Sequence, residues 1–424
     1  MIAAGRFLFL VCFCLLLRGQ VPPVPITIEQ AVAEALANNP TLAAERENSP
    51  LADSRIHTAN LRPNPVLSVA ADYLDVLGTH FSQATNNAGP AEGSGRIDFV
   101  FEGPGKRANR IAMAQQSKSV AELSLQNTIR TLTLDVQNAF IDVLLAKAAV
   151  ALTQENFKSL NTLVASSTQR VNAGNLTGAD LLRAKLAATQ FKNEAATAES
   201  RLHSARHRLQ LLMGRPAFVH GFDVVGEMRR DKERIDIQPL RAQAQELRPD
   251  IQAVVRDQAR SAADLKLQLA QAKIDYTVGT QYHRQQSPTG KGNSLGVFVS
   301  VPLRVFDRNQ GEIERATFEH RQLEDRLRAV RGAAAADVES AYEQYAIAST
   351  MLQNLEGEIL DEAREVRRAA EASFKAAETK LLDFLDAQRA YTDTMQSYND
   401  ARGTYAKSLY LLEAVTGRNL TARR

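Results

Sequence analysis

The chain has 424 residues, of which 44% are hydrophobic and 23% are charged, and its formal net charge of +3 is close to neutral. This balance gives no support for nucleic-acid binding, which would favour an excess of basic residues. The only two cysteines are Cys12 and Cys14, so the composition also excludes a disulfide-rich scaffold.

The first predicted element is a signal peptide over residues 1–20. Arg6 precedes an apolar run from Phe7 to Leu17, which is too short to cross a bilayer but has the length of the central region of a secretion signal. Both cysteines lie inside this run, so the processed chain would hold no disulfide and no thiolate metal site. We therefore expect an exported protein with no cofactor and no N-terminal lipid anchor.

The elements that follow occur twice, which predicts an internal repeat over residues 21–220 and 221–424. Each repeat is expected to hold an opening helix, a strand pair, a long helix and a shorter return helix. The first opening helix covers Ile26–Glu47 and is interrupted at Pro40. The other elements of repeat 1 are expected at about 65–102, 106–172 and 179–213, and those of repeat 2 at about 274–302, 309–374 and 380–416.

The strand pairs are predicted from a period of two. Leu67, Val69 and Ala71 alternate with polar or small residues, and Leu295, Val297 and Val299 do the same in the second repeat. Each strand would be long enough to cross a membrane when tilted, but four strands alone leave open edges, which hydrocarbon does not tolerate. Two interpretations stay open: a small soluble sheet, or strands from several chains pooled in one closed barrel. No helical run of 18 apolar residues is found, so membrane insertion would use strands.

The long helices would each span roughly 100 Å at 1.5 Å per residue. In the second one, apolar residues recur at spacings of four and three from Leu323 to Ile359. Sustained seven-residue periodicity is typical of helices packed in a left-handed supercoil, although an ordinary helical bundle shares this pattern. The fold class is therefore mostly α with a small β part.

Five segments are distinctive: the opening ITIEQAVAEALANNP, the junctions GPGKRANRI and VPLRVFDRNQGEI, and the tip sequences AGNLTGADLLRAK and ETKLLDFLDAQRA. Together they resemble the TolC-like outer-membrane factor family. The resemblance extends from about Ile26 to Leu420. The stretch FDRNQGEI, together with Gly105–Arg107, is most similar to the branch of the family associated with cobalt, zinc and cadmium efflux.

This resemblance implies a homotrimeric, passive duct in the outer membrane of a Gram-negative cell, in contact with outer-membrane lipid. Each protomer would add four strands to a trimeric β-barrel and its helices to a tunnel through the periplasm. The implied partners are a periplasmic membrane-fusion adaptor and an inner-membrane pump of the resistance-nodulation-division (RND) type. The implied cargo is a divalent metal cation; ducts for drug or solvent efflux and for type I protein secretion are the alternatives.

The resemblance also places candidate residues at the two helix turns. Asp383 and Asp386 match acidic positions of the periplasmic constriction, and Asp180 matches the acidic position of the other turn. Symmetry would bring like carboxylates together and attract cations; the alternative is that each is a solvated acid on an amphipathic helix. The turn residues expected to contact the adaptor are Gly174, Asn175, Leu176 and Thr177 in the first turn, and Ala377, Glu378, Thr379 and Lys380 in the second.

The second turn departs from the first at Ala377, which occupies the position of Gly174, so the two turns need not share one backbone geometry. Thr379 stands where some family members carry a gate-locking arginine, so no gate salt bridge is assigned. His203 and His207 could present two imidazoles on one helix face, but three arginines surround them and no third ligand is evident nearby. We expect both histidines to be exposed and unliganded, with no metal site.

Other classes of protein fit less well. A periplasmic adaptor would have one helical hairpin with β-rich domains, and a coiled-coil scaffold would not need two strand pairs. An enzyme is not expected, because no nucleophile elbow, phosphate-binding loop or H-E-x-x-H motif is found.

Overall fold

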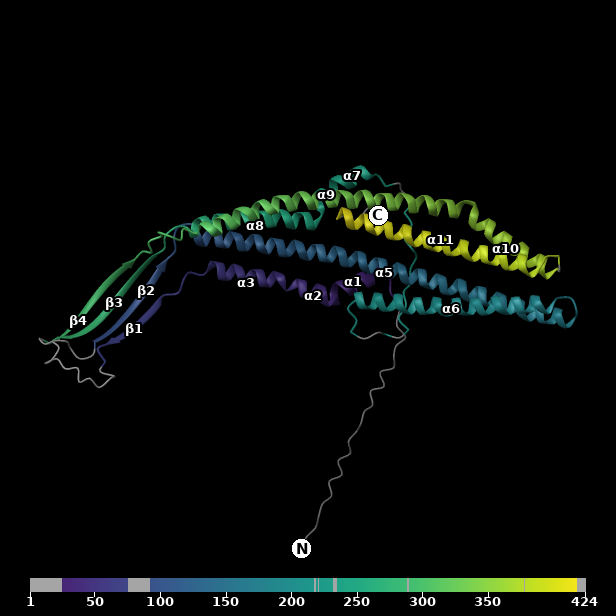
Figure 1. The fold of residues 1–424 in the computed structure, drawn as a ribbon, viewed down its shortest axis with the longest axis horizontal. Helices are drawn as coiled ribbons and strands as arrows, with labels where there is room; N and C mark the ends of the chain where they lie inside the picture. The colour runs from purple at the N-terminus through teal and green to yellow at the C-terminus, as the bar shows by residue number, and fades with distance from the viewer. Residues whose placement is uncertain are drawn as a thin grey trace, which may run out of the picture.

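A computed structural model describes residues 25–74, 92–216, 219, 221–231, 235–287, 290–376 and 378–417. The molecule is a long rod with a sheet at one end and two helical hairpin tips at the other (Figure 1). The described part of the C-terminus ends near the middle of the rod. The signal peptide expected over residues 1–20 lies outside the described residues.

Three short helices open the described chain: α1 (Ile28–Asn38), α2 (Pro40–Arg46) and α3 (Asn48–Asn60). Thr27 and Gln30 form a capping box at the start of α1, and the Asn39 side chain caps α2, whose first residue is proline. The third helix was not among the predicted elements. It tolerates Pro50 because that residue lies in the first turn, where its N–H would have no partner within the helix.

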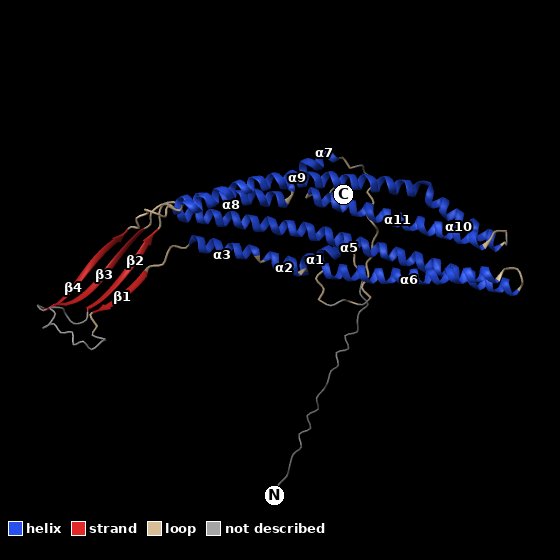
Figure 2. Cartoon of the chain, viewed as in Figure 1, coloured by secondary structure: helices blue, strands red, loops and turns tan. Residues whose placement is uncertain are grey.

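The helical part of the rod is formed by two long hairpins. The first consists of α5 (Lys106–Asn172) and α6 (Gly178–Leu212), and the second of α9 (Gln310–Asn354), α10 (Leu360–Lys375) and α11 (Leu381–Thr416). Two further helices, α7 (Ile237–Leu247) and α8 (Pro249–Gln271), precede the second strand pair. Figure 2 shows the helices running side by side along the rod.

The second long helix differs from the single helix expected over 309–374. A π-helical turn, Leu355–Ile359, separates α9 from α10, and the helix changes direction there (Figure 1). A π-turn inserts an extra residue into the helical repeat and is a recognised cause of kinks. The first long helix, α5, has no such break over its 67 residues.

The four strands form one antiparallel sheet in the order β1 (Val66–Asp72), β2 (Glu92–Phe101), β3 (Tyr276–Ser287), β4 (Gly290–Ser300). In the described part of the chain, β1 and β4 are therefore its outer strands. The strands of the two halves pair through β2 and β3, with Arg96 opposite Gln281. The predicted class, mostly helical with four antiparallel strands, is confirmed.

The joint between sheet and helices is held by a buried charge. The Lys106 Nζ lies 2.7 Å from the Asp275 Oδ1, and the Gly103 N–H donates to the same oxygen at 2.6 Å. Lys106 is only 1% exposed although it is the first residue of α5. This contact ties the start of α5 to the residue just before β3, and so joins the two halves of the chain.

Gly403 sets the approach of α11 to α5. A Cβ at this position would lie 2.5 Å from the Leu145 Cδ1 and 3.0 Å from its Cγ. We expect Gly403→Ala to lower the free energy of unfolding by about 1–3 kcal/mol through overpacking. The matched control is Gly332→Ala in α9, where a Cβ meets nothing within 4 Å; it should instead stabilise by about 0.5–1 kcal/mol. Denaturant midpoints in detergent measure both, and equal midpoints would exclude tight packing at Gly403.

Candidate functional site

The first hairpin tip is a compact turn between α5 and α6. Gly174 adopts a left-handed conformation with φ of 75°, and the Asn175 N–H donates to the Arg170 carbonyl at 2.8 Å. This is the hydrogen bond of a Schellman helix end, which favours glycine at that position. Gly174, Asn175 and Thr177 are exposed and Leu176 is half-buried, so this turn presents a largely free surface in the single chain.

Asp180 is held within that tip by two hydrogen bonds. The Thr177 hydroxyl donates to Asp180 Oδ2 at 2.6 Å, and the Arg183 guanidinium donates to Oδ1 at 3.0 Å. The Thr177 hydrogen bond, followed by that of Arg183, lowers the pKa of the Asp180 carboxyl below its usual value. The acid is therefore ionised and already paired inside its own turn.

The second tip repeats the turn without the glycine. The Glu378 N–H donates to the Ser373 carbonyl at 2.9 Å, which is the equivalent hydrogen bond at a shift of 203 residues. Ala377, the predicted tip residue that replaces Gly174, lies outside the described residues. Glu378 and Lys380 are exposed, and Thr379 is half-buried. The hydrogen bonding of the two tips is thus alike in the part that is described.

The acids of the second tip are less neutralised than Asp180. The Asp383 Oδ2 accepts a hydrogen bond from the Lys380 backbone N–H at 3.1 Å, a helix-capping role. Asp386 has a side chain 63% exposed, and its Oδ1 lies 4.0 Å from the Arg389 guanidinium. At a shift of 203 residues Asp383 matches Asp180, but Asp386 matches Arg183. The first tip therefore pairs Asp180 with a cation, whereas the second tip has an acid, Asp386, at the position of that cation.

Arg170 links the two tips and was not singled out in the sequence. Its guanidinium donates to the Phe374 carbonyl at 3.0 Å and lies 5.1 Å from the Phe374 ring centre. Phe374 in turn packs against Phe384 of α11, with ring centres 6.0 Å apart. A basic residue in the last turn of a helix is a weak sequence signal, because it more often compensates that helix's own dipole.

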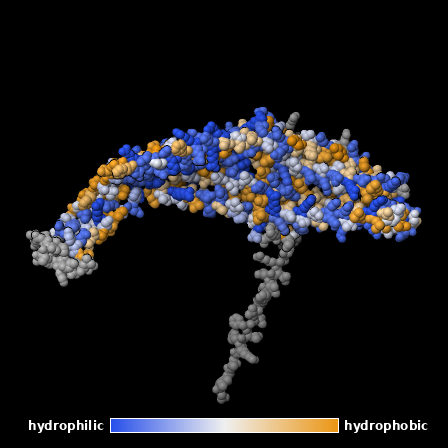
Figure 3. All heavy atoms as spheres, in the orientation of Figure 1, coloured by the Kyte–Doolittle hydropathy of each residue, from blue (hydrophilic) through white to orange (hydrophobic). Residues whose placement is uncertain are grey.

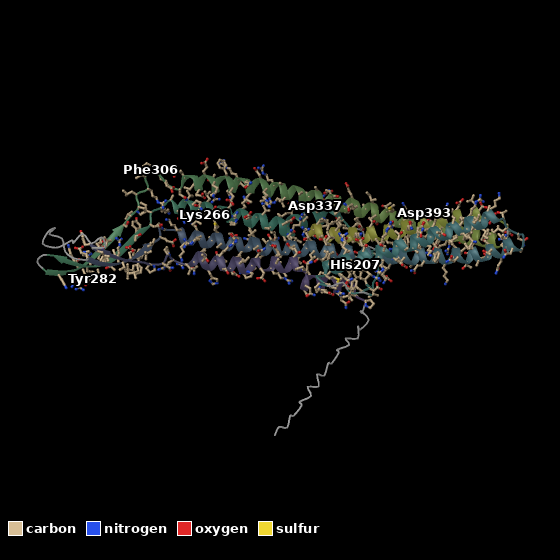
Figure 4. All side chains as sticks on the ribbon, turned by 60° about the horizontal axis from the view of Figure 1, so that its bottom comes forward. His207, Lys266, Tyr282, Phe306, Asp337 and Asp393 are labelled. Carbon is tan, nitrogen blue, oxygen red and sulfur yellow. The ribbon has the colours of Figure 1, made fainter. Side chains whose placement is uncertain are left out.

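The two histidines of the predicted i, i+4 pair lie on α6. His203 and His207 are both exposed (Figure 4 labels His207). Within the described ranges, no group of three or more His, Cys, Asp or Glu side chains is arranged to hold a metal ion.

A polar hollow lies near the middle of the rod, at the π-turn. Its volume is about 560 Å³, and it lies between the segment with Arg230 and Asp231 and helices α9 and α11. Arg230 pairs with Glu356 of the π-turn, and the Tyr405 hydroxyl donates to the Asp231 carbonyl at 2.8 Å. Burial, with the nearby Tyr345, raises the pKa of Tyr405 to about 12, so its hydroxyl stays protonated. The sequence carried no signal for this hollow, because the segments that line it are distant in the chain.

The sheet at the other end of the rod has two different faces. Exposed apolar side chains cover one face, and Figure 3 shows hydrophobic residues gathered over this region. They include Leu67, Val69, Ile97, Phe99, Val278, Leu295, Val297 and Val299. The register places Ser68, Arg96 and Gln281 together on the opposite face. Exposed valine and leucine on a whole sheet face are costly in water and indicate an apolar environment.

One described helix, α5, is also long and apolar enough to cross a membrane by length and composition alone. The expectation that membrane insertion would use strands stays a prediction. The apolar stretch carries Asp142 and Lys147, which pair with Lys407 and Asp223. The same stretch supplies Phe140 and Val143 to the helical core, so its hydrophobicity has a packing explanation.

The sequence model of a family described as outer membrane efflux protein matches residues 31–215 and again residues 240–418. The cobalt-zinc-cadmium resistance protein CzcC of Cupriavidus metallidurans is 24% identical over 403 residues, covering 93% of this chain and 90% of that protein. The outer membrane protein TolC of Escherichia coli is 21% identical, covering 89% and 79%. A crystal structure of CusC superposes with a TM-score of 0.76 at 17% identity, covering 94% of each chain.

Proposed function

The chain belongs to the outer membrane efflux protein family, and we propose that it is the outer-membrane duct of a tripartite system that exports divalent metal cations. It is an outer-membrane efflux protein and not an enzyme. The proposed duct is passive: an inner-membrane RND-type pump supplies the energy, and a periplasmic adaptor connects the two.

The observation that carries this proposal is the open sheet at the end of a long helical rod. Within the described residues, the β1 and β4 edges face no other strand, and the apolar side chains of one face are exposed. Hydrocarbon accepts a sheet only when its edges are closed on themselves. Three copies of this four-stranded sheet, joined β4 to β1, would close such a barrel and cover both edges.

The helical rod supports the proposed tunnel. The α5 helix has 67 residues, which at 1.5 Å per residue is roughly 100 Å. The end of the rod away from the sheet carries both hairpin tips. The proposed adaptor contacts there are Gly174, Asn175, Leu176 and Thr177 of the first tip and Ala377, Glu378, Thr379 and Lys380 of the second. We propose Asp383 and Asp386 as the acidic residues of the periplasmic aperture, with Asp180 beside them.

The proposed cargo rests on the metal-resistance relative and on the exposed acids of the second tip, which are less neutralised than Asp180. CzcC is named for resistance to cobalt, zinc and cadmium. Exposed carboxylates such as that of Asp386, brought together by symmetry, would raise the local concentration of cations at the aperture.

A survival test separates this cargo from the alternatives. A strain of the native host that lacks the protein should become sensitive to zinc, cobalt or cadmium, and the wild-type chain should restore growth. A matched chain with Gly311→Ala, where a Cβ meets nothing within 4 Å, should restore it equally. Sensitivity to organic toxins alone would retain the duct but assign it to drug or solvent efflux. Recovery of the mature protein from the soluble periplasm would contradict the duct itself.

A further inference from the structure

On the polar face of the sheet, the side chains of Arg96, Asp98 and Phe298 form a layer that lies against the strands. The Arg96 Nε donates to the Asp98 Oδ1 at 2.8 Å, and the Arg96 guanidinium lies 4.7 Å from the centre of the Phe298 ring. In the register, Asp98 is opposite Gly279, which is opposite Phe298. The three side chains therefore come from two strands, β2 and β4, and Arg96 contacts both of the others across Gly279 of β3, the strand between them.

Two glycines make room for this layer. A Cβ at Gly279 would lie 2.0 Å from the Asp98 Oδ1, and a Cβ at Gly296 would lie 3.1 Å from the Phe298 ring. Neither glycine is among the described residues with positive φ, so the backbone does not require them. Glycine is required at both positions because neighbouring side chains occupy the space above the backbone: the Asp98 carboxylate covers Gly279, and the Phe298 ring covers Gly296.

Both glycines lie on the face that would line the lumen of a closed barrel. Direct pairing aligns Ser68, Arg96, Gln281 and Gly296 on this face. The exposed Leu67, Ile97 and Val297 alternate with them on the other face. An apolar face directed to lipid leaves the Arg96 face directed inward.

From this geometry we propose that Gly279 and Gly296 set the bore of the strand-lined part of the duct, by letting Asp98 and Phe298 lie against the wall. The inference rests on the proposed function, because only a closed barrel has a lumen. The Arg96–Asp98 pair also keeps this layer electrically balanced, since each guanidinium is matched by a carboxylate. Residues that control passage are thus placed at the exit of the duct, far from the periplasmic tips.

The bore can be measured by thiol labelling from outside the cell. Ser300 is exposed, and lies on the lumen-facing side at the helix-proximal end of β4, beyond Gly296. In a Ser300→Cys background, maleimide polymers of increasing size are applied to intact cells. Gly279→Ala should slow labelling by the larger polymers severalfold, because the new methyl group displaces the Asp98 carboxylate into the lumen. Gly296→Ala should act in the same direction through Phe298.

A matched control lies on the same strand and the same face. A Cβ at Gly292 meets nothing within 4 Å, so Gly292→Ala should leave the size limit unchanged. The double variant Gly279→Ala with Asp98→Ala should restore labelling, because the displaced side chain is gone. This rescue also shows that Gly279→Ala does not act by misfolding.

The outcomes are distinct. Equal size limits in the Gly279→Ala, Gly296→Ala and Gly292→Ala chains would overturn the inference while leaving the duct intact. Failure of the Asp98→Ala rescue would overturn the proposed displacement. Labelling of every chain by polymers of all sizes, with the protein recovered outside the membrane, would overturn the proposed function together with the inference.

Discussion

Replacing Asp275 with alanine is expected to lower the free energy of unfolding by about 3 kcal/mol, the lower end of the range for breaking a buried ion pair. The substitution leaves the Lys106 ammonium without its acceptor, and the Lys106 side chain is only 2% exposed. Removing one partner is costly because the remaining charge is neither hydrated nor neutralised. The Asp275 side chain is 33% exposed, which is why the lower figure is expected.

The effect should be local to the joint between sheet and helices. Asp275 also accepts the hydrogen bond from the Gly103 N–H, so its loss releases the turn before α5 as well as the lysine. We expect the strand sheet to lose its fixed orientation relative to α5 and α8. Denaturant titration in detergent, followed by tyrosine fluorescence and by circular dichroism, would measure the loss of stability.

Two controls separate charge from packing. Asp53→Ala removes the partner of Lys118, but this pair is 47% and 32% exposed, so the expected loss is only about 0–1 kcal/mol. Lys106→Met combined with Asp275→Ala removes both charges and should recover most of the stability. Equal losses in the Asp275→Ala and Asp53→Ala chains would contradict a special role for the joint.

The core of the second hairpin was well predicted by its apolar period. Of the seam residues proposed from the sequence, Leu323, Val338, Ala341, Ala348 and Leu352 are buried. The prediction is wrong at the end of this apolar series: Ile359 is 43% exposed, and the next residue, Leu360, is buried instead. The π-turn at Leu355–Ile359 adds one residue and shifts the buried face by one position. Sequence periodicity assumes a constant helical repeat, and so it could not place this shift.

The contacts that organise the functional ends were harder to predict. The alternation of Leu67 and Val69 indicated a strand with one apolar face, yet nothing local showed that Asp98 would cover Gly279 of a strand 181 residues further along the chain. A lysine at the start of a helix is usually exposed, yet Lys106 is buried and pairs with Asp275 of the other half of the chain. Such pairs depend on the register between the two halves, which propensity and period do not encode.

Neutralising the acids of the second tip is expected to change ion selectivity most. In the proposed trimer, Asp386 and Asp383 of each protomer face their copies around the aperture. We expect Asp383→Asn with Asp386→Asn to lower the permeability of cations relative to anions roughly tenfold, because a ring of carboxylates concentrates cations at its mouth. Planar-bilayer recordings in a salt gradient give this ratio directly. Loss of the repulsion between like carboxylates should also change the fraction of time that the channel is open.

The choice of asparagine separates the charge of Asp383 from its structural role. Asparagine can still accept the Lys380 N–H that now bonds to Asp383, so the start of α11 is retained. Asp180→Asn is the matched control at the equivalent position of the first tip. Its carboxylate is already paired with Arg183 and Thr177, so it should contribute less to the field at the aperture. An unchanged permeability ratio in the Asp383→Asn, Asp386→Asn chain would place both acids outside the constriction. A shift as large in the Asp180→Asn chain would show instead that the whole ring of tips, rather than the second tip alone, selects the ion.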